Sequence, residues 1–119
     1  MESRQTQSVN RPDKGRKAKA MNIIESTVRH QLQTIEDQLE EITQDIEWAT
    51  KMAREHQSIV DFHAANPERK GKDCYGIDQL KNSQIALREF QESIVRDTTR
   101  QEFLSKFMET LRSDYQIAA

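Results

Sequence analysis

Helix breakers and cysteines are scarce in this chain of 119 residues. It contains 1 Cys, 2 Pro and 3 Gly, and no apolar run approaches the roughly 20 residues of a membrane-spanning helix. Because Cys74 has no second cysteine, an intramolecular disulfide is excluded and a disulfide-stapled secreted domain is not expected. The first residues lack the apolar core of a signal peptide, so we expect a cytoplasmic or nuclear protein.

Apolar residues are also few, whereas charged residues are abundant. Hydrophobic residues make up 34% of the chain and charged residues 32%. This balance, with so few breakers, is typical of long helices that bury a narrow apolar stripe. A disordered chain shares the low apolar content but has no regular apolar period, so periodicity decides between the two.

Charge is unevenly distributed, although the net charge is only −2. Residues 1–20 carry six basic residues against two acidic ones, whereas residues 36–47 carry six acidic residues and no basic one. Because residues 1–20 also contain Pro12 and Gly15 and show no apolar period, we predict a disordered basic arm. No aromatic residue is interleaved with these charges, so base stacking is not indicated. The arm is interpreted as a solvated tail, with a nuclear localisation signal or contact with nucleic acid, acidic lipid or an acidic partner as alternatives. The candidate contact residues are Arg11, Lys14, Arg16, Lys17 and Lys19.

A heptad pattern begins at Val28 and continues for more than four heptads. Apolar residues recur in steps of three and four, which predicts a helix with one coiled-coil seam. Asn22 followed by Glu25 resembles a capping box, so we expect this helix over residues 21–62. The predicted seam consists of Val28, Leu32, Ile35, Leu39, Ile42, Ile46, Ala49, Ala53, His56 and Val60.

Turn residues interrupt the pattern over 63–76. Asn66-Pro67 predicts a loop with a short helical turn after the proline, and Asp78 is a candidate cap for a second helix over 77–117. In this second helix Ser83, Asp97 and Gln101 are polar residues at seam positions. The apolar seam positions are Leu80, Leu87, Phe90, Ile94, Leu104, Met108, Leu111 and Tyr115.

Two predicted helices of comparable length around one break indicate a chain that folds back on itself. A turn near residue 70 would bring Ile35 close to Leu104 and Ile46 close to Ile94. A single continuous rod is disfavoured, because proline and two glycines would lie inside it. We therefore predict an all-α fold in which residues 21–119 form a long antiparallel two-helix hairpin or coiled coil.

The helices carry more apolar surface than this seam uses. Trp48, Met52 and Ile59 form a second stripe on the first helix. One seam, at about 25 cal/mol per Å² of apolar area, barely offsets the entropy of ordering the chain, so we predict a multi-helix bundle with partner chains. The candidate partner-binding residues are Trp48, Met52, Ile59, Phe103, Phe107, Leu111 and Tyr115.

The polar seam residues bear on the kind of partner. Asp97 and Gln101 occupy consecutive seam positions, where they would destabilise a symmetric apolar core. This favours a heteromeric assembly over self-association. The other interpretation is a stutter that shifts the heptad register at this point.

Motifs of catalysis are not apparent in the sequence. His56 and His63 are seven residues apart, too far for the i, i+4 pair of helical metal sites, and Cys74 completes no ligand set. Phosphate-binding loops and nucleophile elbows are likewise missing. We expect no enzyme activity, metal, cofactor or small-molecule substrate.

The function predicted from the sequence is that of a structural subunit. It would pack coiled-coil helices into a heteromeric assembly, with other helical proteins as partners. One alternative is a homo-oligomer whose basic arm binds nucleic acid weakly. A second is a transient helical chaperone for a partner protein.

Overall fold

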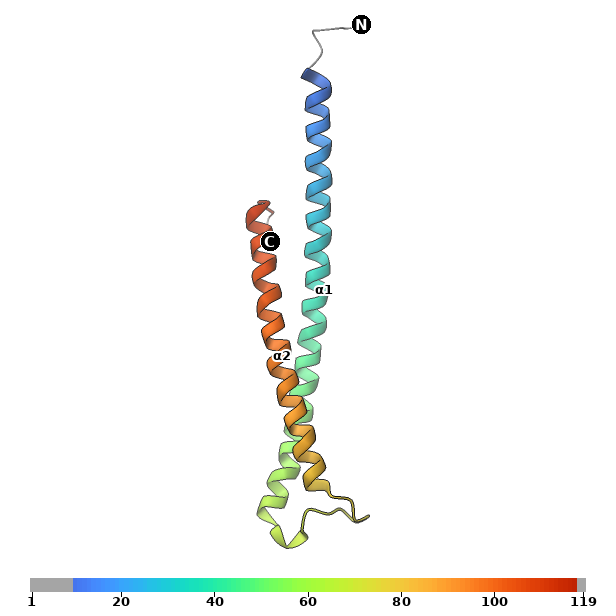
Figure 1. The fold of residues 1–119 in the computed structure, drawn as a ribbon, viewed down its shortest axis with the longest axis vertical. Helices are drawn as coiled ribbons and strands as arrows, with labels where there is room; N and C mark the ends of the chain where they lie inside the picture. Colours follow the sequence, from blue (N-terminus) through green and yellow to red (C-terminus); the bar gives the residue numbers. More distant parts are fainter. Residues whose placement is uncertain (1–9, 118–119) are drawn as a thin grey trace. The chain divides into compact units, whose positions relative to one another are not determined.

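The computed structural model describes residues 10–117, with side chains from residue 22 onward (Figure 1). Its elements are α1 (Asn10–Ala65), a 3₁₀ turn η1 (Pro67–Arg69) and α2 (Gln79–Asp114). Over the described range there is no β-strand, only an isolated bridge between Lys72 and Asp78. The prediction of an all-α hairpin of two long, mutually packed helices is confirmed.

Helix α1 begins at Asn10, well before the expected start near residue 21. Pro12 lies in the first turn, where its missing N–H removes no intrahelical hydrogen bond. Asn22 is inside the helix, and Glu25 pairs with Arg29 at 3.1 Å rather than closing a capping box. With 56 residues in α1 and 36 in α2, the prediction of comparable lengths is wrong. Residues 1–9 of the predicted arm lie outside the described residues.

The first half of the connection forms around Asn66 and Pro67. The Asn66 side chain donates a hydrogen bond of 2.8 Å to the carbonyl of Phe62, which satisfies one of the last open carbonyls of α1. Pro67 then opens η1, so the predicted helical turn after this proline is confirmed. Lys70 and Gly71 follow with positive φ, and together they turn the chain back.

The second half of the connection is held by two aspartates. Asp73 Oδ1 accepts hydrogen bonds from the backbone N–H groups of Tyr75 (2.8 Å) and Ile77 (3.0 Å). Asp78 Oδ1 accepts one from Lys81 N–H at 3.0 Å, which confirms Asp78 as the N-cap of α2. The loop is therefore an ordered turn that sets where α2 begins.

Helix α2 ends in a reversal of the chain at Gln116. This residue has φ 55°, and Ile117 N–H donates to Arg112 C=O at 2.8 Å, the long bond of a Schellman motif. The reversal returns the Ile117 side chain to the protein, where it is 7% exposed. Tyr115 is 50% exposed and lies past the end of the helix, so its predicted place on the seam is wrong.

The chain packs as two units. The described part of the first, called the terminal unit, comprises residues 10–37 and 107–117; the second, the loop unit, comprises residues 38–106. In the terminal unit Val28, Leu32 and Ile117 form an apolar cluster. Met108 and Leu111 pack against that cluster from α2.

Polar pairs lie between the helices of the loop unit. His63, 4% exposed, donates from Nε2 to Gln79 Oε1 at 2.8 Å, and a hydrogen bond of 3.2 Å joins His56 Nδ1 to Ser83 Oγ. Gln101 donates to Thr43 Oγ1 at 3.1 Å, within the same unit. The polar seam residues Ser83 and Gln101 thus each have a hydrogen-bond partner on α1, whereas the buried Nδ1 of His63 has none.

Candidate protein interaction site

A groove with a volume of about 360 Å³ runs between α1 and α2 in the loop unit. Its apolar part centres on Trp48 and Phe90, whose rings meet edge to face with centroids 5.3 Å apart. Phe90 also stacks on His56 with ring centroids 5.9 Å apart. Both are seam residues, so the groove adjoins the seam. The lining residues are Asp45, Trp48, Ala49, Glu89, Phe90, Ser93, Arg96 and Asp97.

Heptad position explains why these residues line one groove. The seam residues occupy positions a and d of the heptad, so each lining residue falls at position c, d or g. Positions c and g lie on one side of each seam, and positions b and e lie on the other. Antiparallel pairing brings the c and g positions of both helices to the same side of the hairpin, which creates the groove.

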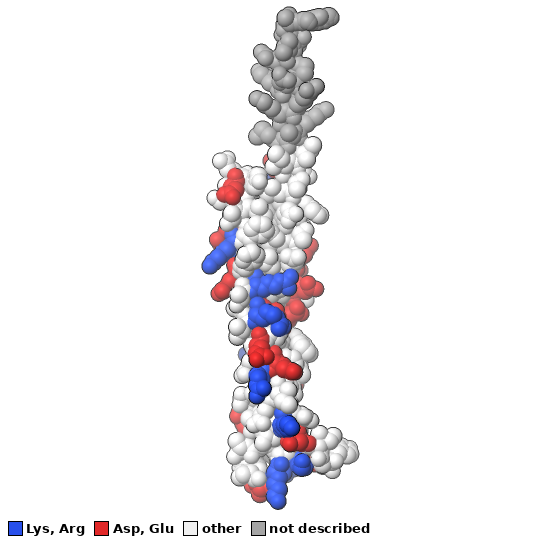
Figure 2. Space-filling view, viewed as in Figure 1, with Lys and Arg blue, Asp and Glu red and all other residues white. Residues whose placement is uncertain are grey.

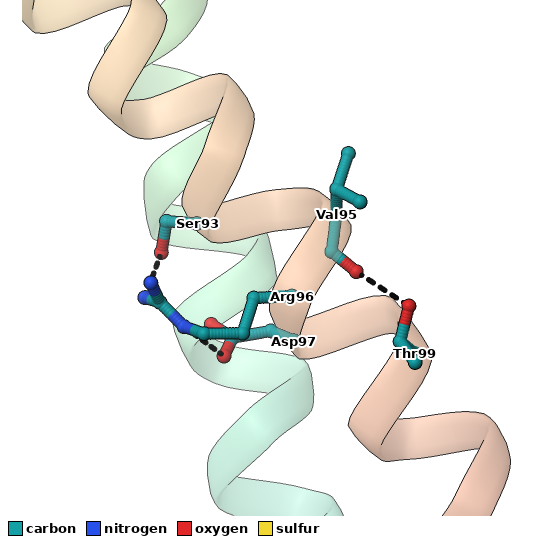
Figure 3. Close-up of polar contacts among 5 residues, drawn as sticks. All are labelled: Ser93, Val95, Arg96, Asp97 and Thr99. Carbon is teal, nitrogen blue, oxygen red and sulfur yellow. Dashed lines mark hydrogen bonds and ion pairs between the residues drawn. The ribbon is translucent and has the colours of Figure 1, made fainter.

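The polar wall of the groove is held by Arg96. Its Nη2 donates to Ser93 Oγ at 3.2 Å, and its Nε lies 3.9 Å from Asp97 Oδ1 (Figure 3). Val95 lies on another side of the same turn of α2, with its carbonyl accepting from Thr99 Oγ1 at 3.0 Å. The side chain of Asp97 is only 16% exposed, and the neighbouring guanidinium reduces the cost of placing this charge on the seam.

The groove as a whole is acidic. Its lining has three carboxylates and one guanidinium, and Arg96 is engaged by Asp97. Within residues 22–117, no ion pair is formed by Asp45 or by Glu89. On the face seen in Figure 2 both signs of charge are interspersed.

The predicted partner-binding residues differ in exposure. Trp48 is 59% exposed and Phe103 66%, Phe107 is exposed to a lesser degree, and Met52, Ile59 and Leu111 are half-buried. Leu111 packs on the cluster of Val28 and Leu32, so it belongs to the core of the terminal unit. The structure joins Trp48 to the groove, whereas Met52 and Ile59 follow it along the same side of α1 at positions g.

The predicted seam residues are all buried or half-buried, apart from Tyr115. Five of the six basic residues of the predicted arm lie on the helical backbone of α1 from Asn10 onward, but their side chains are outside the described part of the chain. The sequence missed four lining residues, Asp45, Glu89, Ser93 and Arg96, because polar residues carry no apolar period. Ser93 and Arg96 follow Glu89 at spacings of four and seven, which places the three on one side of α2.

Two further observations concern the described residues alone. No group of three or more His, Cys, Asp or Glu side chains is arranged to hold a metal ion between residues 22 and 117. Neither helix, where described, combines the length and the apolar character that crossing a bilayer requires. Comparison with protein-family models, with curated proteins and with solved structures found no match to this chain.

Proposed function

We propose that this chain is a non-catalytic interaction subunit, a helical hairpin that completes a multi-helix bundle with helices of other proteins. The observation that supports the proposal is an incomplete core. Among the described residues no large side chain is completely buried, while eleven large hydrophobic side chains are exposed. A hairpin with so thin a core gains little stability alone, and a further helix would bury the half-exposed seam and its neighbours.

The composition of the exposed surface supports a protein partner. Trp48 and Phe90 meet in a groove bordered by Arg96, and tryptophan and arginine are enriched among the residues that dominate binding energy at interfaces. The acidic lining argues against a symmetric pairing of two copies through this groove, because a two-fold axis would set the same carboxylates against each other. A heteromeric assembly is therefore favoured over a homo-oligomer.

The proposal is tested by the mass of the native particle. The chain weighs 13.9 kDa, so native mass spectrometry of the chain recovered from its own cells distinguishes a heteromer from a multiple of that mass. We expect a heteromeric particle that Trp48→Asp disrupts, because Trp48 lines the groove. Val95→Asp is the matched control: its side chain is also largely exposed but lies outside the groove, so this variant should leave the particle intact. A monomer that unfolds cooperatively, with both variants equal to wild type, would overturn the proposal.

A second candidate function rests on the charge of residues 1–20. Six basic residues against two acidic ones would attract phosphates, and from Asn10 onward they follow a helical backbone. A chain that lacks residues 1–20 should then lose binding to DNA or RNA together with its salt dependence. Equal retention of the full and shortened chains on nucleic acid at low salt would dispose of this candidate.

A further inference from the structure

The two sides of the hairpin differ in the loop unit. On the side of positions c and g, here called the c/g face, α1 presents Trp48, Met52, Ile59 and Phe62, at spacings of four, seven and three. Trp48 and Phe62 are exposed and the two residues between them are half-buried. These four residues form an apolar stripe about four helical turns long, next to the seam, which is interrupted at position c by the exposed Glu55.

The opposite side, formed by positions b and e, is polar. Here Val95 is the one large apolar side chain in the part of this unit that is helical. Its other members on α2 include Lys81, Gln84, Arg88, Gln91, Thr98 and Glu102, and those on α1 include Glu47, Thr50, Arg54, Gln57 and Asp61. One side is therefore suited to packing and the other to water.

We infer that the c/g face of the loop unit binds a third helix, supplied by another protein, whose apolar stripe is flanked by lysine or arginine. This inference rests on the proposed function and names the surface and the chemistry of its partner. The groove, at about 360 Å³, is within the lower range of ligand-sized pockets, roughly 300–1,000 Å³, and receives an apolar side chain against Trp48 and Phe90. Continuity with the seam makes the bound helix part of one core.

The flanking basic residues are argued from Asp45 and Glu89. These carboxylates border the groove on α1 and α2, and among the described residues neither forms an ion pair. A helix that crosses the groove with a basic residue on each side of its apolar anchor would bring a cation near each carboxylate. An acidic helix, or a second copy placed symmetrically, would meet like charge.

The sole tryptophan provides a direct readout, because Trp48 is the only one in the chain and lies in the groove. The probes are two synthetic amphipathic helices of about four heptads with leucine at a and d, one carrying lysine at e and g and the other glutamate. The lysine peptide should shift Trp48 emission to shorter wavelength and protect it from acrylamide quenching, with at least tenfold tighter binding than the glutamate peptide.

Charge reversal at the groove tests the placement. Asp45→Lys with Glu89→Lys should invert the preference between the two peptides. Both side chains are exposed, so we expect circular dichroism to show unchanged helicity. The matched control is Glu47→Lys with Glu102→Lys, which makes the same change of charge on the b and e side. That control should keep the wild-type preference for the lysine peptide.

Each other outcome overturns the inference. The acidic c/g face is not the recognition surface if the two peptides bind equally or if neither changes the emission. The same follows if the two charge reversals have equal effects. An emission shift that grows with the concentration of the chain alone would identify a second copy as the occupant. The proposed function is tested separately. If the heteromer persists with Asp45→Lys and Glu89→Lys, the proposed function stands but this face is not the binding surface. If the native chain is a monomer, the proposed function itself is wrong.

Discussion

The terminal unit and the loop unit both bury apolar seam residues, Ile42 and Ala49 in the loop unit, but only the loop unit adds hydrogen-bonded polar pairs between its described helices. In the terminal unit an apolar cluster of Val28, Leu32 and Ile117 is joined by side chains from α2. In the loop unit the inter-helix contacts include the polar pairs of His63 with Gln79 and of His56 with Ser83. Apolar packing is non-directional and tolerates small shifts, whereas a buried hydrogen bond requires one register.

The difference indicates a division of roles between the two units. The apolar cluster supplies stability, because each buried aliphatic side chain contributes about 1.5–3 kcal/mol. The polar pairs, together with the ordered turn at residues 66–78, specify which positions of α1 and α2 face each other. The predictions below test this division, beginning with the largest expected effect.

Truncation of the apolar cluster should have the largest effect. Leu32→Ala removes a side chain that is 6% exposed, so we expect a loss of about 2–5 kcal/mol in the free energy of unfolding. Leu87→Ala, at a half-buried seam position of the loop unit, should cost less, about 1–2 kcal/mol. Urea denaturation followed by circular dichroism measures both, and a larger loss at Leu87 would contradict the division.

Strain in the turn should have the next largest effect. Gly71 has φ 75°, and a Cβ at this position would lie 2.9 Å from Leu80 Cβ, so Gly71→Ala should cost about 2–3 kcal/mol. Gly76 has φ 80° but open space around it, so Gly76→Ala should cost only about 1–2 kcal/mol, the conformational part. Thermal unfolding of the two variants compares them, and equal melting temperatures would show that Leu80 does not restrict the turn.

The polar pair of His63 and Gln79 should behave non-additively. Gln79→Leu leaves the buried Nε2–H of His63 without its acceptor, which should cost about 1–3 kcal/mol. His63→Leu combined with Gln79→Leu replaces the pair by apolar groups and should be close to neutral. A double-mutant cycle by urea denaturation gives the coupling. If the double variant loses as much as the sum of the single variants, the pair has no specific role.

A small stabilising effect is expected at the end of α2. Gln116 holds φ 55° without the freedom of glycine, so Gln116→Gly should raise the free energy of unfolding by about 1 kcal/mol. Gln116→Ala, which cannot relieve the left-handed conformation, should not be stabilising. The two melting temperatures are compared by circular dichroism. A destabilised glycine variant would show that the Gln116 side chain itself holds the reversal.

Much of the local structure was predictable because its signals are local. Asp78 is a good cap whatever follows, and Pro67 both ends one helix and begins a helical turn. The start of α1 was mispredicted because Pro12 falls in the first turn, where a proline is accepted, and a single glycine such as Gly15 costs a helix only about 1 kcal/mol. Half of the candidate site, the stripe that begins at Trp48, followed from spacing alone.

The seam itself came from the sequence, because a period of 3.5 residues determines both a helix and the side that it buries. The choice of the c/g face depended on tertiary structure. Neither helix alone defines a groove, and only antiparallel pairing puts Trp48 beside Phe90 and Asp45 on the same side as Glu89. The burial of Ile117 likewise required the chain to reverse at Gln116, a backbone conformation that a glutamine does not signal.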